Sequence, residues 1–196
     1  MRILSIDSSL GTQLLLCDAE PGVSADGAPR PLEVLSSQAL QDSRRHAESL
    51  GPMLATALAA PSDGAPLDAV VAATGPAPFT GLRAGLVTAR ALSRARSIPA
   101  HGVPSLDAVA RLALDELGAR QGEKDPVVLV ATDARRREVY AALFRANGPD
   151  DVTRLTEISV CPPAQVAECI AVQTPEQGSG AGTIDAVAGS GAALYP

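Results

Sequence analysis

The histidines are the first residues to test for chemistry, because an imidazole beside a carboxylate can hold a metal or move a proton. His46 and Glu48 stand two positions apart in a segment with helical spacing. Two ligands on one helical face need a spacing of three or four, and the position that would complete such a pair is Leu50. His101 has no paired ligand nearby in the sequence. The pattern therefore predicts no metal site and no cofactor.

Two aspartates at predicted strand ends are the candidate acids. Phosphoryl transfer needs an acid, a metal and a phosphate cradle in each lobe. The cradles would be 8–12 and 189–191, so the candidate residues of a vestigial nucleotide cleft are Asp7, Ser8, Ser9, Asp133, Gly189 and Gly191. Aspartate at such a position commonly closes a turn. We favour the turn role for both acids.

The segment from Gly75 to Gly85 is the most informative stretch. It predicts a strand end, a rigid Gly/Pro turn, an N-cap at Thr80 and a helix start, where free amides could meet an anion. A purely structural turn is the commoner outcome. Along the helix Gly81, Gly85 and Ala89 recur at four-residue steps and form a flat ridge that would let another helix approach closely.

Arginines follow this ridge on a neighbouring face of the same helix and recur in a later turn. Arg83, Arg90 and Arg94 are either solvated or turned toward an acidic partner. The run 135–137 is expected to be a solvated hairpin tip, with contact to RNA or a partner left open.

Composition limits the classes of function. The chain has 196 residues, 46% hydrophobic and 19% charged, which is typical of a folded soluble protein. A net charge of −6 and only 2% aromatic residues argue against autonomous nucleic-acid binding. The three cysteines form no CxxC pair and are expected to be buried thiols in a reducing compartment. No targeting segment or membrane span is predicted, so we expect a cytoplasmic protein.

The hydrophobic pattern places these residues on an alternating series of elements. Strands are expected over 2–7, 12–17, 32–38, 67–74, 98–103, 127–133 and 139–144, and helices over 43–60, 80–94 and 106–117. Ser43 is the expected cap of the first helix, which Pro52 should kink.

The second half of the chain repeats the order of predicted elements found in the first half. Asp7 and Asp133 each follow a strand and precede a turn and a further strand. Asp68 and Asp185 each lie in an Asp-Ala-Val run before a glycine. The two pairs suggest a duplicated ββ(β)αβ unit, with chance similarity in an Ala/Val-rich chain as the alternative.

In order along nearly the whole chain, the segments 3–9, 46–52, 75–85, 103–106, 131–140 and 189–192 resemble the TsaB (YeaZ) family of bacterial tRNA threonylcarbamoyladenosine biosynthesis. The Gly-Pro-x-x-Phe-Thr-Gly-Leu-Arg run is the most specific of them. The resemblance implies an actin-like (ASKHA, Hsp70/sugar-kinase type) duplicated α/β fold, with two lobes each built on a mixed sheet. It implies an N-terminal lobe over 1–103 and a C-terminal lobe over 104–196 that lacks the family's C-terminal tail.

The resemblance also implies a role. Such proteins are non-catalytic scaffolds that dimerise with the catalytic paralogue TsaD, help recruit the ATPase TsaE, meet tRNA only within the complex, and form homodimers when alone. TsaD holds a metal through an HxxxH pair that this chain lacks. The interface expected on the first two helices consists of His46, Glu48, Leu50, Met53, Leu54, Gly81, Leu82, Arg83, Gly85, Leu86, Ala89 and Arg90.

Two other functions stay open from the sequence. One is a small phosphotransferase or peptidase-like enzyme of the same fold, using the cleft residues given above. The other is a tRNA-binding module that acts through the arginine clusters, which the acidic charge balance disfavours unless a partner completes the surface.

Overall fold

A computed structural model describes residues 1–20, 32–40, 46–59, 65–118, 125–171 and 184–195. The chain forms two compact units, Met1–Ser105 and Leu106–Pro196. The expected helix cap Ser43 lies outside the described residues.

The first unit is built on a five-stranded mixed sheet. Its strands are β1 (Arg2–Asp7), β2 (Thr12–Asp18), β3 (Glu33–Leu40), β4 (Ala69–Ala73) and β5 (Ala100–Val103), in the order β3-β2-β1-β4-β5. The pairs β1–β2 and β2–β3 are antiparallel, while β1–β4 and β4–β5 are parallel. Buried and half-buried residues alternate along β1, as expected for a strand with one face on the core. The opening hairpin predicted from the sequence is confirmed.

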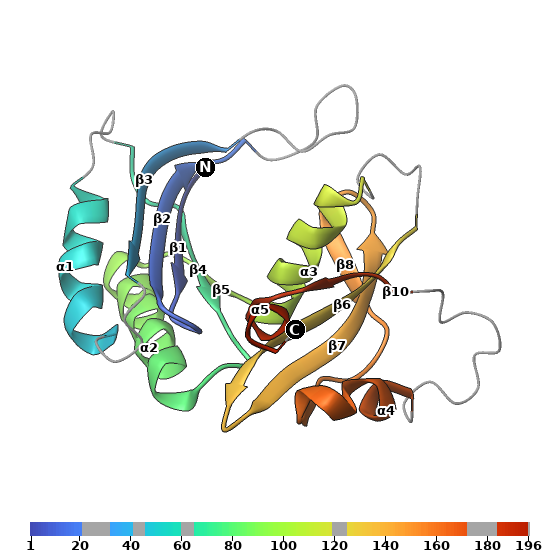
Figure 1. Ribbon diagram of the computed structural model, residues 1–196. Coiled ribbons are helices and arrows are strands. Elements are labelled where there is room, and N and C mark those ends of the chain that lie inside the picture. The colour runs from blue at the N-terminus through green and yellow to red at the C-terminus, as the bar shows by residue number, and fades with distance from the viewer. Residues whose placement is uncertain (21–31, 41–45, 60–64, 119–124, 172–183, 196) are drawn as a thin grey trace. The chain divides into compact units, whose positions relative to one another are not determined.

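Two helices cover one face of this sheet. Helix α1 (His46–Leu58) packs on β2 and β3, and α2 (Phe79–Arg96) packs on β1 and β4, so the helices lie side by side (Figure 1). Pro52 lies inside α1 as predicted. The predicted N-cap at Thr80 is wrong: Pro78 occupies the N-cap position with φ −54° and ψ 127°, and no side chain caps the helix. The ring of Pro78 already sets the φ that leads the backbone into the helix, which therefore begins one residue before Thr80.

In the described part of the second unit the sheet has five strands. They are β6 (Val127–Arg135), β7 (Glu138–Asn147), β8 (Asp151–Arg154), β9 (Ser159–Cys161) and β10 (Ile184–Ala188), in the order β10-β6-β7-β8 with β9 beside β7. Helix α3 (Ser105–Glu116) inserts Leu106, Ala110 and Leu114 into one core of this sheet. The short elements η2 (Pro163–Gln165), α4 (Val166–Ala171) and α5 (Ser190–Leu194) complete the unit, and Val166 and Ile170 of α4 belong to a second core.

The two units repeat one design. The order β8-β7-β6-β10 reproduces β3-β2-β1-β4, with the same antiparallel and parallel pairs. Asp68 Oδ2 accepts a hydrogen bond from the backbone N–H of Arg2 at 2.6 Å, and Asp185 Oδ2 accepts one from Val127 at 2.8 Å. Each carboxylate thus holds the first residue of its unit's first strand. The predicted duplication is confirmed, because chance similarity would not reproduce the contact as well as the residues.

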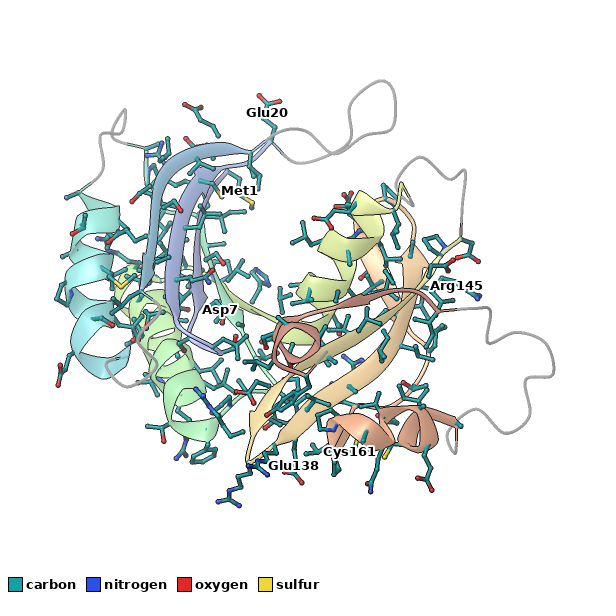
Figure 2. The ribbon with its side chains drawn as sticks, viewed as in Figure 1. Met1, Asp7, Glu20, Glu138, Arg145 and Cys161 are labelled. Atoms are coloured by element: carbon teal, nitrogen blue, oxygen red, sulfur yellow. The ribbon has the colours of Figure 1, made fainter. Side chains whose placement is uncertain are left out.

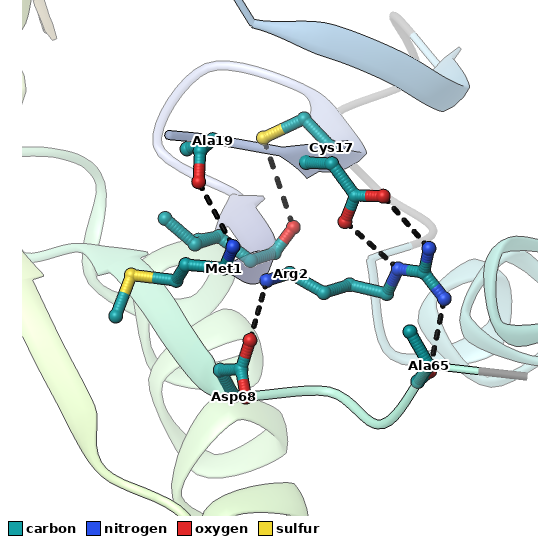
Figure 3. A network of polar contacts seen from close by, with 8 residues as sticks. Met1, Arg2, Cys17, Ala19, Ala65 and Asp68 are labelled. Carbon is teal, nitrogen blue, oxygen red and sulfur yellow. Dashed lines mark hydrogen bonds and ion pairs between the residues drawn. The ribbon is translucent and has the colours of Figure 1, made fainter. Parts of the chain in front are cut away.

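Arg2 anchors the start of the chain (Figure 3). Its side chain is buried, with 5% exposure of the residue. The guanidinium donates to both carboxylate oxygens of Asp18, at 2.9 and 2.7 Å, and to the carbonyl of Ala65 at 2.9 Å. The hydrogen bond from Arg2 is the main cause that lowers the pKa of Asp18 from its ordinary value.

Replacing Asp18 with Asn should remove stability that depends on pH. A lowered folded-state pKa stabilises the fold above the unfolded-state pKa of about 4, and this stability is lost as the pH falls through the folded-state value. Wild type should therefore exceed Asp18→Asn in urea midpoint at pH 7, and the gap should close as the pH falls below about 4. An equal gap at pH 7 and pH 3 would contradict this coupling.

Candidate functional site

The small-residue ridge of α2 faces the protein's own sheet. Gly81, Gly85 and Ala89 are all buried. Ser8 Oγ donates to the carbonyl of Gly81 at 2.8 Å and accepts from the N–H of Gly85 at 3.1 Å. A Cβ atom at Gly85 would collide with Ser8 Oγ and would meet Ile6 Cγ2 at 3.5 Å. The prediction that Gly81, Gly85 and Ala89 form the partner interface is wrong, because their lack of side-chain bulk lets α2 lie against β1.

The larger apolar side chains predicted for the interface are also buried or half-buried in the first unit. Leu50 is 2% exposed and belongs to the core of the first unit, so its assignment to the interface is wrong as well. Met53, Leu54 and Leu86 are half-buried against the same core. Leu82 packs beside the Gly75 turn, where a Cβ on Gly75 would meet Leu82 Cδ2 at 2.8 Å. Hydrophobic residues on these helices mostly serve the fold.

The outward face of α2 carries a different set of residues. Phe79, Arg83, Val87, Arg90 and Arg94 are exposed at steps of three or four, and we call them the outer α2 stripe. Phe79 and Val87 are 69% and 66% exposed. The Arg83 guanidinium carbon lies 4.3 Å from the centroid of the Phe79 ring, a cation–π contact. Arg83 and Arg90 lie on the surface as predicted.

Sequence reasoning missed Phe79 and Val87. Their spacing of four from Arg83 on either side was the signal that could have found them, since it places all three residues on one helical face. Large apolar side chains gathered on an exposed helix surface commonly mark an interaction site.

A groove runs beside the stripe, between α2 and the edge strand β5. Its volume is about 660 Å³. Its lining includes Arg90, Arg94 and His101 together with the apolar side chains of Leu86 and Ala100. The outer surface of α2 is therefore basic as well as apolar.

The α1 residues predicted for the interface are only partly placed. Glu48 is exposed. The side chain of His46 lies outside what the structure describes. The neighbouring positions Gly51, Pro52, Ala55 and Thr56 are exposed and small, so this side of α1 is flat.

The residues of the predicted cleft are engaged in turns and packing within their own units. Asp7 Oδ1 accepts from the N–H of Ser9 at 2.7 Å, and Asp133 Oδ1 accepts from the N–H of Arg135 at 2.9 Å. Figure 2 labels Asp7 at the end of β1. The turn role favoured for both aspartates is confirmed.

The glycines of the second cradle are needed for packing. A Cβ on Gly189 would collide with the carbonyl oxygen of Ala131, and one on Gly191 would meet the same oxygen at 2.9 Å. Gly189 also has φ 101°, a conformation that favours glycine. Between them, Ser190 Oγ accepts from the N–H of Asp133 at 3.0 Å. These contacts let the start of α5 approach β6.

The arginine run forms the β6–β7 turn with an unusual backbone. Arg135, Arg136 and Arg137 are exposed and have φ values of 68°, 54° and 63°. The predicted solvated tip is confirmed. Left-handed backbone costs an ordinary residue roughly 1–2 kcal/mol, which is why such hairpin turns usually contain Asn or Gly.

Solved structures define the class of this architecture. A crystal structure from Pseudomonas aeruginosa, described as an uncharacterized protein with similarity to peptidase YEAZ, matches with a TM-score of 0.63 and 25% identity, covering 84% of this chain and 68% of that one. YeaZ from Pseudomonas aeruginosa matches with a TM-score of 0.62 and 24% identity over the same shares. The protein has the duplicated, actin-like α/β fold expected from its sequence.

The family follows from the sequence match. The model of the TsaD family, tRNA N6-adenosine threonylcarbamoyltransferase, matches residues 33–187. The chain belongs to this family, and its resemblance to the TsaB (YeaZ) proteins is confirmed.

Curated relatives from mycobacteria extend the comparison. Uncharacterized proteins of Mycobacterium bovis and Mycobacterium tuberculosis are 44% identical over 146 residues, which is 71% of this chain. The chain spans 64% of the length of these relatives. Across the described ranges, none of the helices has both the length and the apolar character needed to cross a membrane.

A substitution at Gly85 should destabilise the fold, because this residue lies on the face of α2 that packs on β1. We expect Gly85→Ala to cost about 1–3 kcal/mol in free energy of unfolding, since the added methyl meets Ser8. Gly51→Ala is the control on the exposed side of α1: outside its chain neighbours nothing lies within 4 Å of its Cβ position, so it should cost clearly less than Gly85→Ala even though Pro52 follows it. Urea unfolding followed by circular dichroism measures both, and equal effects would refute the close approach.

Proposed function

We propose that this protein is a non-catalytic, cytoplasmic subunit of a tRNA threonylcarbamoyladenosine synthesis complex, and that it docks through the outer α2 stripe and the flat face of α1. The partner is a TsaD-type paralogue, and the pair recruits a TsaE-type ATPase. The observation that carries this proposal is the exposure of Phe79 and Val87 beside three arginines on one helix. The match to the TsaD family supports the choice of tRNA threonylcarbamoylation as the reaction of the complex.

The chemistry of the surface fits a helical partner. Small exposed residues on α1 let a second helix approach closely, while the stripe on α2 offers apolar area to bury. Burying a Phe or Val side chain contributes about 1.5–3 kcal/mol. The guanidinium groups of Arg83 and Arg90 would select a partner with carboxylates opposite them.

A homodimer would use the same surface. A twofold interface places one patch against its own copy, so self-association and binding to the paralogue should compete. The proposed homodimer is therefore the resting form of the free protein.

The proposal that this chain performs no chemistry has two supports in the first unit. The hydroxyl of Ser8, in the first predicted phosphate cradle, is committed to the backbone of α2. The position four residues after His46 holds Leu50, a core residue, where the paralogue is expected to have a second histidine. The alternative is a phosphotransferase or peptidase-like enzyme, and micromolar binding of ATP and Mg²⁺ with turnover by the purified chain would establish it.

Val87→Asp tests the proposed surface. We expect binding to the purified TsaD-type paralogue to weaken about tenfold or more, because the change replaces buried apolar area with a charge in the complex. Leu112→Asp is the matched control, since Leu112 on α3 is 63% exposed and lies in the other unit. Calorimetric titration gives both affinities, and circular dichroism verifies that both variants fold.

Unchanged affinity of Val87→Asp, or an equal loss with Leu112→Asp, would refute this docking surface. The role itself is tested separately by a tRNA modification assay from which each protein is omitted in turn. Full modification without this chain would refute the proposed function.

Contact with tRNA within the complex is proposed for the β6–β7 tip. A strained turn made of three arginines is costly to keep, which favours a role beyond connecting two strands. Arg136→Glu should weaken binding of tRNA to the assembled complex and leave assembly unchanged. Arg96→Glu, the same charge change in the last turn of α2, should leave both unchanged, as measured by gel shift and size exclusion.

A further inference from the structure

Two of the cysteines belong to one core of the second unit. Cys161 ends β9, where it pairs with Val139 of β7, and Cys169 lies in α4. The turn η2 brings α4 back onto β9, and Cys169 packs against the core cluster that contains Cys161. Figure 2 labels Cys161 close to α4. Sequence reasoning treated these cysteines only as separate buried thiols and did not pair them.

The surroundings of the pair are asymmetric. Cys161 is 4% exposed and belongs to a core cluster with Val166 and Ile170. Cys169 is half-buried and packs on the edge of that cluster. Cys169 is therefore the more exposed residue of the two and the one that a small reagent would meet first.

We propose that Cys161 and Cys169 form a dithiol site that closes to a disulfide when a peroxide oxidises the protein. The packing of α4 on β9 places both cysteines at one core cluster, and closure brings the two sulfurs to a bond length of about 2.0 Å. The bond would tie α4 covalently to β9 and so to the sheet of the second unit.

The chemistry balances with hydrogen peroxide as the oxidant. The thiolate of Cys169 attacks one peroxide oxygen, the O–O bond breaks, and the leaving hydroxide takes a proton to become water. The resulting sulfenic acid is attacked by the sulfur of Cys161, which loses its proton as a second water departs. The two thiols are oxidised by two electrons in total, and one peroxide is reduced to two waters.

The environment of Cys161 agrees with its role as the second thiol. Burial above all, and then the neighbouring thiol of Cys169, raises the pKa of Cys161 to about 11. Cys161 is thus protonated at neutral pH and is a poor first nucleophile.

Cys17 provides a control within the same molecule. It is 4% exposed in the first unit, and its Sγ donates to the carbonyl of Ile3 at 3.8 Å. Burial raises its pKa as well. The chain has three cysteines in all, and the other two lie in the second unit, so Cys17 has no thiol in its own unit with which to pair.

The experiment treats the folded full chain with hydrogen peroxide, then unfolds it in denaturant, blocks free thiols with iodoacetamide and maps the peptides by mass spectrometry. We expect the loss of two hydrogen atoms, with one disulfide between Cys161 and Cys169 and an alkylated Cys17. Reduction with dithiothreitol should restore all three alkylation sites.

Single variants make the assignment specific. Cys169→Ser and Cys161→Ser should each abolish closure, whereas Cys17→Ser should close at the wild-type rate. Cys169→Ser is the safer test of the pair, because position 169 is only half-buried and serine should fold there. The proposal is overturned if both thiols stay open to alkylation after peroxide, if Cys169 proceeds to sulfinic acid without pairing, or if only bonds between molecules form.

Discussion

The contact between α2 and β1 through Ser8 is the constraint on which the rest of the first unit depends. One hydroxyl serves both the carbonyl of Gly81 and the N–H of Gly85, which requires a helix face without side chains. This contact sets the rotation of α2 about its axis. Once the glycines point inward, Phe79, Arg83 and Val87 must point outward, because they lie on the opposite side of a helix with 3.6 residues per turn.

The second unit also brings a helix close to its first strand, but with different residues. There Gly189 and Gly191 bring α5 onto the carbonyl of Ala131, and Ser190 accepts from the backbone of Asp133. The paired carboxylates Asp68 and Asp185 hold equivalent strands in the two units. The aspartate contact is thus the same in both units, while the contacts between helix and sheet are made by different residues.

The limits of sequence reasoning appear at particular residues. The opening hairpin, Pro52 inside α1, the turn role of Asp7 and the exposure of Arg83 follow from local patterns, and the structure agrees with each. The ridge Gly81–Gly85–Ala89 was identified correctly as a close-packing face, but its partner was not, because periodicity defines a face without saying what it meets. The same holds for Leu50, and for Cys161 and Cys169, whose place at one core cluster depends on the path of η2.

By itself the sequence determined the elements, the duplicated plan and the family, because hydrophobic periodicity, turn residues and motifs are local properties of the chain. Only the tertiary structure decided which side of α2 is inside, which aspartates hold strands, and which two cysteines share a core. Those outcomes depend on distances of a few ångströms between segments far apart in the chain. Several faces of a helix can look equally able to pack when only the sequence is read. Close packing of the core decides which of them is buried.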